Sequence, residues 1–156
     1  METIVRQPNT RDEWKQYYHL RWQILRQPWN QPPGSEKDEL EDQSIHRIAA
    51  IEKNNSLQII AVARLHYTEN NTAQIRYMAV DEHFRLKGIG QKILLSLENT
   101  AKKEMVTSIE LNARESAVPF YQANQYQIIG PGHLLYDEIR HKKMKKILLP
   151  IKNNPA

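Results

Sequence analysis

Residues 78–91, MAVDEHFRLKGIGQ, are the stretch of this 156-residue sequence that decides its fold. The stretch begins as an apolar strand, passes through a charged turn and enters a helical pattern at Gly88. The start of a helix presents unpaired backbone N–H groups and the positive end of the helix dipole. Glycine at Gly88 and Gly90 lets an anion approach these groups, and Arg85 and Lys87 add positive charge. The stretch therefore predicts a binding site for phosphate groups.

Two glycines alone would be better explained as a tight strand-to-helix turn, so the prediction depends on the residues around them. Two other phosphate-binding patterns do not fit the stretch. The Walker pattern requires four residues between its glycines, followed by Lys and then Ser or Thr. The dinucleotide-binding pattern requires a third glycine at the position of Ile93. The basic residues, the preceding strand and the following helix together favour an anion site of another kind.

The segments around this stretch alternate between strand and helix patterns. Apolar residues recur at helical intervals after Gly88, at Ile89, Ile93, Leu94, Leu97 and Ala101. An earlier helix is expected over residues 11–27, with Thr10 as its N-cap and Pro28 at its end. Short helices are expected over 36–42 and 116–124, and strands near 4–5, 46–51, 57–65, 72–80, 108–111, 126–130 and 134–149. The order β-α-α-β-β-β-α-β-α-β-β predicts a mostly antiparallel sheet with helices packed against it.

Two motifs resemble those of the GNAT acetyltransferase family. Residues 85–90, RLKGIG, follow the strand end Met78-Ala79-Val80 and are similar to the family's coenzyme-binding motif, Gln/Arg-x-x-Gly-x-Gly/Ala. Residues 111–121, LNARESAVPFY, resemble the next family motif, which has Asn-Ala-x-x-x-Ala-x-x-Phe-Tyr spacing. The two motifs occur in the family's order and at its separation.

The sequence departs from the family at Glu82, where proline is frequent, and at Gln125-Tyr126, where Gly-Phe is usual. Residues 138–144, EIRHKKM, together with Leu20-Arg21, more loosely resemble the ElaA-like subgroup. The resemblance implies one α+β domain over residues 1–156 with the GNAT-type three-layer fold. That fold has a mixed, mostly antiparallel sheet of about seven strands with helices on both faces.

The resemblance also implies an N-acetyltransferase that uses acetyl-CoA and an unidentified primary amine, on a small molecule or peptide. The backbone of residues 78–80 would bind the pantetheine arm, and residues 85–91 the pyrophosphate. Asn112 would contact the arm or an ordered water, and Tyr121 would donate a proton to the sulfur. The expected coenzyme contacts are Met78, Ala79, Val80, Arg85, Leu86, Lys87, Gly88, Ile89, Gly90, Gln91, Asn112 and Tyr121. A purely structural role is the alternative for Tyr121, and a non-catalytic acetyl-CoA sensor is the alternative for the chain.

The general base is left open by the sequence. Glu110, Glu138, His46 and His141 are the candidates, with water alone as a further alternative. An ordinary surface or packing role is the better explanation for each of them taken singly. Glu138 and His141 have opposite parity on a regular strand, so they cannot both face one pocket without a bulge.

The composition limits the other classes of function. The absence of cysteine excludes disulfides, a thiol nucleophile and thiolate zinc sites. No cluster of histidines suggests a metal, and we expect a soluble, cytoplasmic protein without a membrane segment. The formal charge of +4 and the lysines of residues 142–146 could suggest nucleic acid. We interpret that run instead as a solvated sheet edge and expect no nucleic-acid partner. The sequence leaves open whether the chain forms a homodimer through its last strands. Trp14 is expected in the core, and Trp22 and Trp29 either pack or line an acceptor pocket.

Overall fold

The structure, a computed structural model, describes residues 2–148 and contains one seven-stranded sheet. The strands follow the order β1-β2-β3-β4-β5-β7-β6. The ladders β1–β2, β2–β3, β5–β7 and β6–β7 are antiparallel, and β4–β5 is parallel. The predicted α+β fold class, with its mixed and mostly antiparallel sheet, is therefore confirmed. The chain divides into two compact units, one of residues up to His66 with Tyr77–Leu97, the other of Tyr67–Arg76 with the chain from Glu98.

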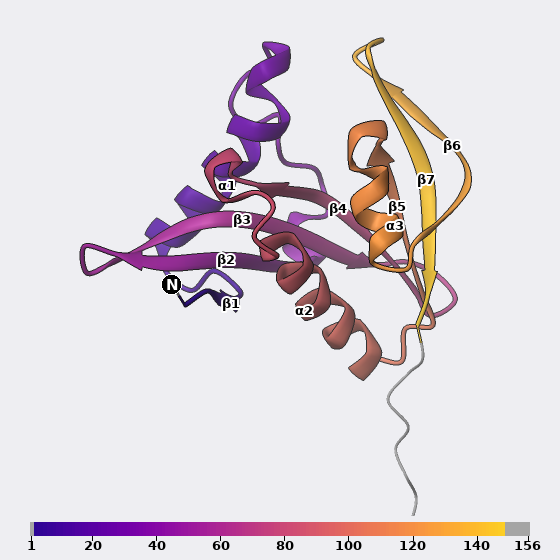
Figure 1. Cartoon of the computed structure of the whole chain (residues 1–156), viewed down its shortest axis with the longest axis horizontal. Coiled ribbons are helices and arrows are strands. Elements are labelled where there is room, and N and C mark those ends of the chain that lie inside the picture. Colours follow the sequence, from indigo (N-terminus) through magenta and orange to yellow (C-terminus); the bar gives the residue numbers. More distant parts are fainter. Residues whose placement is uncertain (1, 149–156) are drawn as a thin grey trace, which may run out of the picture. The chain divides into compact units, whose positions relative to one another are not determined.

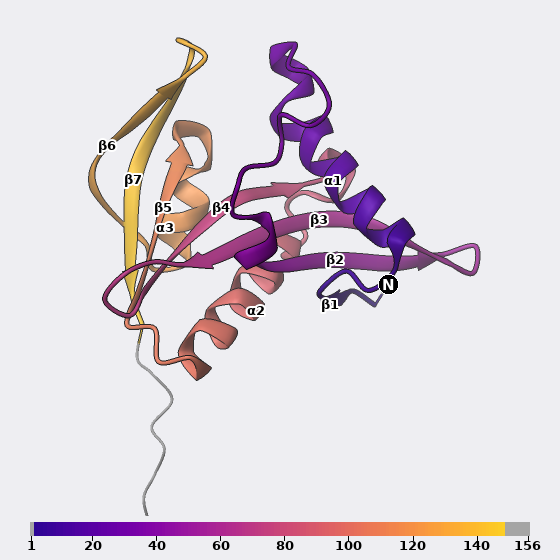
Figure 2. The same ribbon diagram turned by 180° about the vertical axis from the view of Figure 1, so that it is seen from behind.

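The first unit is a sheet layer between two helices. Its strands are β1 (Ile4–Arg6), β2 (Ile45–Lys53), most of β3 (Ser56–Tyr67) and the end of β4 (Thr72–Val80). Helix α1 (Arg11–Leu25) lies on one face of these strands, and the first part of α2 (Ile89–Lys103) lies on the other (Figures 1 and 2). The α1 face closes a buried core of Tyr17, Leu20, Leu25, Ile48, Ala50, Ile59, Val62, Tyr77 and Ala79. Trp14, which was expected in the core, is partly buried and packs against these residues.

Local sequence signals account for both helices. The Thr10 hydroxyl accepts the Glu13 backbone N–H at 3.1 Å, as the N-cap prediction requires. Helix α1 ends at Leu25 rather than at residue 27, and a 3₁₀ turn, Gln27–Trp29, with Pro28 near its start, follows it. The predicted apolar face of α2 is confirmed, since Ile89, Ile93, Leu94, Leu97 and Ala101 are all buried.

The helix predicted over residues 36–42 is wrong. Only a 3₁₀ turn, Glu41–Gln43, forms near its end. The acidic side chains bind backbone N–H groups instead: Glu36 accepts from Gly34 at 2.9 Å, and Asp38 accepts from Leu40 at 2.8 Å. Side chains that bond to nearby backbone in this way compete with helix formation.

The second unit contains the remaining strands and one short helix. The start of β4 pairs with β5 (Ser108–Arg114), from Thr72 with Ser108 to Ile75 with Leu111. Helix α3 (Val118–Ala123) has Pro119 in its first turn, as predicted, and covers one face of β5 and β7 (Figures 1 and 2). The other strands are β6 (Gln127–Leu135) and β7 (Ile139–Ile147).

The boundaries of the last two strands differ from the prediction. Strand β6 continues to Leu135, and a tight turn follows in which Tyr136 and Asp137 both have positive φ, 53° and 56°. Two successive residues with positive φ are typical of the turns that join antiparallel strands. The strand predicted from Leu134 therefore begins at Ile139, and its expected end at Leu149 lies outside the described residues.

The interpretation of the lysine run as a sheet edge is also wrong. Strand β7 lies between β5 and β6 and is paired on both sides. Its lysines alternate between the two faces, and Lys146 donates to the buried carboxylate of Glu98 at 2.8 Å. The Tyr126 hydroxyl donates to the other oxygen of Glu98, also at 2.8 Å.

Candidate coenzyme and catalytic site

The backbone changes direction at Tyr77, inside strand β4. Tyr77 has a φ of 61°, a left-handed conformation that is unusual for a bulky residue. Its ring lies beside three guanidinium groups, at 4.5 Å from Arg21, 4.9 Å from Arg64 and 5.5 Å from Arg26. Such strain persists only where the surroundings enforce it, and it is frequent next to binding sites. Residues 78–80, which the sequence assigned to the coenzyme arm, follow directly after this left-handed residue.

The loop after β4 is attached at both ends. The Asp81 N–H donates to the Ile60 carbonyl of β3 at 2.8 Å. The Asp81 carboxylate accepts from the His83 N–H at 2.9 Å and so caps the short turn Glu82–Phe84. The Arg85 Nε returns to the Val80 carbonyl at 3.3 Å. These hydrogen bonds hold the residues before Leu86 in place, and the segment between Arg85 and α2 faces solvent.

Two left-handed residues shape this segment. Leu86 has a φ of 63° and a fully exposed side chain, and Gly88 has a φ of 77°. A Cβ on Gly88 would meet no atom within 4 Å, so the space before the helix is open. The Gly88 carbonyl accepts the Lys92 N–H at 3.1 Å, which leaves the N–H groups of residues 89–91 without carbonyl partners inside the helix. This geometry fits an anion such as a diphosphate.

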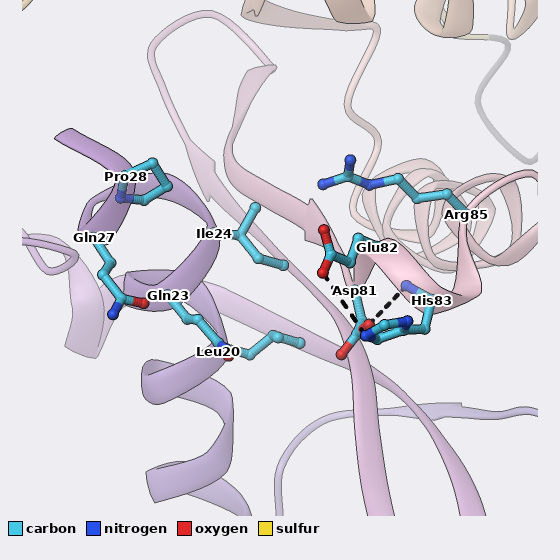
Figure 3. Close-up of a pocket in the computed structure, with 9 residues that line it drawn as sticks. All are labelled: Leu20, Gln23, Ile24, Gln27, Pro28, Asp81, Glu82, His83 and Arg85. Carbon is cyan, nitrogen blue, oxygen red and sulfur yellow. Dashed lines mark hydrogen bonds and ion pairs between the residues drawn. The ribbon is translucent and has the colours of Figure 1, made fainter.

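A pocket of about 310 Å³ opens beside the loop. Side chains from the end of α1 and from the loop face one another across it (Figure 3). Its walls are Leu20, Gln23, Ile24, Gln27, Pro28, Asp81, Glu82, His83 and Arg85. Gln27 and Pro28 bring the turn after α1 into the wall of this pocket. Trp22 does not line it, and its indole N–H donates to the Gln31 carbonyl at 2.9 Å.

The second unit positions the other predicted residues. Asn112 lies on β5 opposite Lys143 of β7. Tyr121 on α3 is buried, edge-on to the rings of Phe120 and Tyr126 at 5.1 and 5.7 Å. Burial raises the pKa of Tyr121, so its hydroxyl keeps its proton at neutral pH. A protonated hydroxyl is what a proton donor needs.

Comparisons with known proteins decide the family. The model of the acetyltransferase (GNAT) family matches residues 14–125. The chain belongs to the GNAT family. It is 26% identical over 135 residues to the uncharacterized N-acetyltransferase YjcF of Bacillus subtilis, covering 86% of this chain and 93% of the relative.

Solved GNAT structures share the fold of this GNAT chain. A GNAT acetyltransferase from Staphylococcus aureus Mu50 superposes with a TM-score of 0.76 at 20% identity, over 95% of this chain and all of the other. An aminoglycoside 6′-N-acetyltransferase complexed with coenzyme A gives a TM-score of 0.75 at 14% identity, over the full length of both chains.

The structure separates the four base candidates of this GNAT chain. His46 is buried, and both its ring nitrogens are used: Nδ1 accepts from the Tyr17 hydroxyl at 2.7 Å, and Nε2 donates to the Glu41 carbonyl at 2.8 Å. Glu110 lies 3.6 Å from Lys143 on a partly exposed face. Glu138 follows the hairpin turn and lies outside β7. His141 is buried in β7 and uses one ring nitrogen, Nδ1.

Within residues 2–148, no three His, Asp or Glu side chains are grouped as metal ligands would be. In the same part of the chain, no helix has the length and apolar character needed to cross a membrane.

Proposed function

We propose that this chain is an N-acetyltransferase that passes the acetyl group of acetyl-CoA directly to a primary amine. The observation that carries the proposal is the loop 85–91, in which two left-handed residues leave the amides of a helix start open. Membership of the GNAT family supports the same conclusion. The family match spans residues of both units, which supports treating residues 1–156 as one acetyltransferase domain. A homodimer and a cytoplasmic location remain predictions.

We assign roles to residues of each unit taken by itself. In the first unit, the backbone of residues 78–80 binds the pantetheine arm and the amides of residues 85–91 bind the diphosphate. In the second, Asn112 contacts the arm and Tyr121 donates a proton. The amine nitrogen attacks the thioester carbonyl, the C–N bond forms and the C–S bond breaks. The amine gives one proton to a base or to water, the departing thiolate takes the proton of Tyr121, and solvent then returns a proton to Tyr121.

Calorimetry with acetyl-CoA tests the binding site. We expect micromolar binding, weakened about tenfold or more in Gly88→Val, because the side chain fills the approach and strains the left-handed backbone. Gly34→Val is the matched control, since Gly34 also has a positive φ, 101°, and open space around it, but lies outside the loop. Equal loss in both variants, or no binding by the wild type, would contradict the proposal.

Turnover then separates an enzyme from a sensor. An assay of thiol release with a panel of amines should show acetyl transfer. The non-catalytic alternative would be favoured if the protein binds acetyl-CoA but releases no thiol from it, either with any amine of the panel or without an amine.

A further inference from the structure

The His141 ring has a defined tautomer. Its Nδ1 lies 3.0 Å from the Ile139 carbonyl and 3.1 Å from the His133 carbonyl. Carbonyl oxygens only accept hydrogen bonds, so Nδ1 carries the proton and Nε2 carries the lone pair. Within residues 2–148, Nε2 has no hydrogen-bond partner. The ring therefore keeps one basic nitrogen available, in contrast to His46, where both nitrogens are used.

The neighbouring strand holds this ring in place. The His133 ring stacks on it with centroids 4.3 Å apart and planes 23° apart. Gly132 of β6 makes the approach possible, because a Cβ there would lie 2.7 Å from the His141 Cβ and from its backbone carbon. Atoms at that distance cannot coexist, so the position requires glycine. The His141 ring is thus held by hydrogen bonds to two carbonyls, by the stacked His133 ring and by the close backbone of Gly132. These contacts fix the direction in which Nε2 points.

The surroundings keep the ring neutral. Burial, the neighbouring His133 and the charge of Arg114 together lower the pKa of His141 below its ordinary value of 6.5. Lys143, two residues further on the same face of β7, is paired with Glu110 at 3.6 Å. At pH 7 the imidazole is therefore unprotonated and can accept a proton.

The register places the ring next to a residue assigned to the coenzyme. His141 pairs with Arg114, and Lys143 pairs with Asn112. Cross-strand partners share a face, so His141, Arg114 and Asn112 lie on one face of the sheet. Adjacent strands are about 4.8 Å apart, and two residues along a strand span about 6.7 Å. The His141 and Asn112 side chains are therefore close enough for one water molecule to connect Nε2 with a thioester bound beside Asn112.

We propose that His141 is the general base that takes the proton from the acceptor amine during attack on the thioester. The proposal rests on the proposed acetyltransferase function. Nε2 accepts the proton, directly or through one water, as the nitrogen forms its bond to the carbonyl carbon. The C–S bond breaks, and the Tyr121 hydroxyl protonates the thiolate. Tyr121 packs against Tyr126, which shares the Glu98 carboxylate with Lys146. Lys146 and His141 point to opposite faces of β7, so acid and base lie on opposite faces of this strand.

The decisive variant is His141→Asn, with His133→Gln as the control. The asparagine amide can still donate to the carbonyls that Nδ1 binds, but it lacks the basic nitrogen. Thiol release from acetyl-CoA is followed across the pH range, with ethanolamine and also without an amine, since attack by water needs the same base. We expect the rate of His141→Asn to fall about 10²-fold or more, with unchanged acetyl-CoA affinity by calorimetry.

The pH profile distinguishes a base from a structural residue. The wild-type rate should fall as the pH drops through a midpoint below 6.5, and His141→Asn should lose that limb. His133→Gln should keep the limb and move it to higher pH, because one cause of the lowered pKa is removed. Equal rates and profiles for wild type and His141→Asn, with acetyl-CoA bound by both, overturn the proposal.

Failure of the proposed function has a different signature. In that case the wild type neither binds acetyl-CoA nor releases thiol. Nitrogen NMR of the imidazole then still tests the geometry, since a protonated Nε2 at neutral pH would refute the assigned tautomer and the proposal with it.

Discussion

Replacing Arg64 with methionine removes one of the two fully buried arginine charges of the first unit. The Arg64 side chain is fully buried, and its Nη1 lies 2.6 Å from both Asp38 Oδ1 and Glu41 Oε2. Its Nη2 donates to the second oxygen of Asp38 at 3.1 Å. Methionine is long and flexible but uncharged, so the variant leaves these carboxylates beside an apolar side chain. The segment after α1 loses its main attachment to β3.

The structure allows the cost to be worked out. Removing one partner of a buried ion pair costs about 3–5 kcal/mol, because the remaining charge stays desolvated. Glu41 keeps a 2.8 Å bond to Arg21, so we expect the lower end, about 3 kcal/mol. For a domain of this length, that change lowers Tm by about 6–12 °C.

The matched control is Arg6→Met. Arg6 and Glu13 also approach to 2.6 Å, but the Arg6 side chain is 30% exposed. Water therefore screens this pair in part, and we expect Arg6→Met to cost less than Arg64→Met. Urea unfolding followed by tryptophan fluorescence reports on this unit, because Trp14, Trp22 and Trp29 all belong to it. If Arg64→Met costs no more than Arg6→Met, burial does not set the strength of these ion pairs and the reasoning is refuted.

Two further predictions concern Tyr121 and Glu13. Tyr121→Phe should release thiol about 10²-fold more slowly than wild type with acetyl-CoA affinity retained, and equal rates would remove the hydroxyl from the mechanism. The hydrogen bond from Arg6 lowers the pKa of Glu13 from 4.5 to about 2, so the stability it provides is complete above pH 4.5 and is lost as the pH falls towards 2. Urea titrations at about pH 5 and about pH 3 should show a smaller acid destabilisation for Glu13→Gln than for wild type, and parallel losses would contradict the assignment.

Features set by neighbouring residues in the sequence could be predicted. The cap at Thr10, the apolar face of α2 and the glycine at Gly88 follow from local spacing, and the structure has them where the sequence indicated. The position of β7 could not be predicted, because strand order depends on contacts between distant segments. A run of lysines is typical of an edge strand, yet here it lies on an interior strand. One of these lysines, Lys146, is paired with the carboxylate of Glu98.

The left-handed turn at Tyr77 shows most clearly what the sequence could not reveal. No glycine marks the position, and arginine is a residue that is usually exposed, so neither Arg21 nor Arg64 suggests a buried partner. The strained backbone costs about 1–3 kcal/mol. A desolvated cation over an aromatic ring contributes about 2 kcal/mol. Two fully buried guanidinium groups beside the Tyr77 ring are therefore enough to offset the strain, and the carboxylates of Asp38 and Glu41 are what keep those groups buried. The conformation of the strand end thus depends on a segment more than thirty residues earlier in the chain.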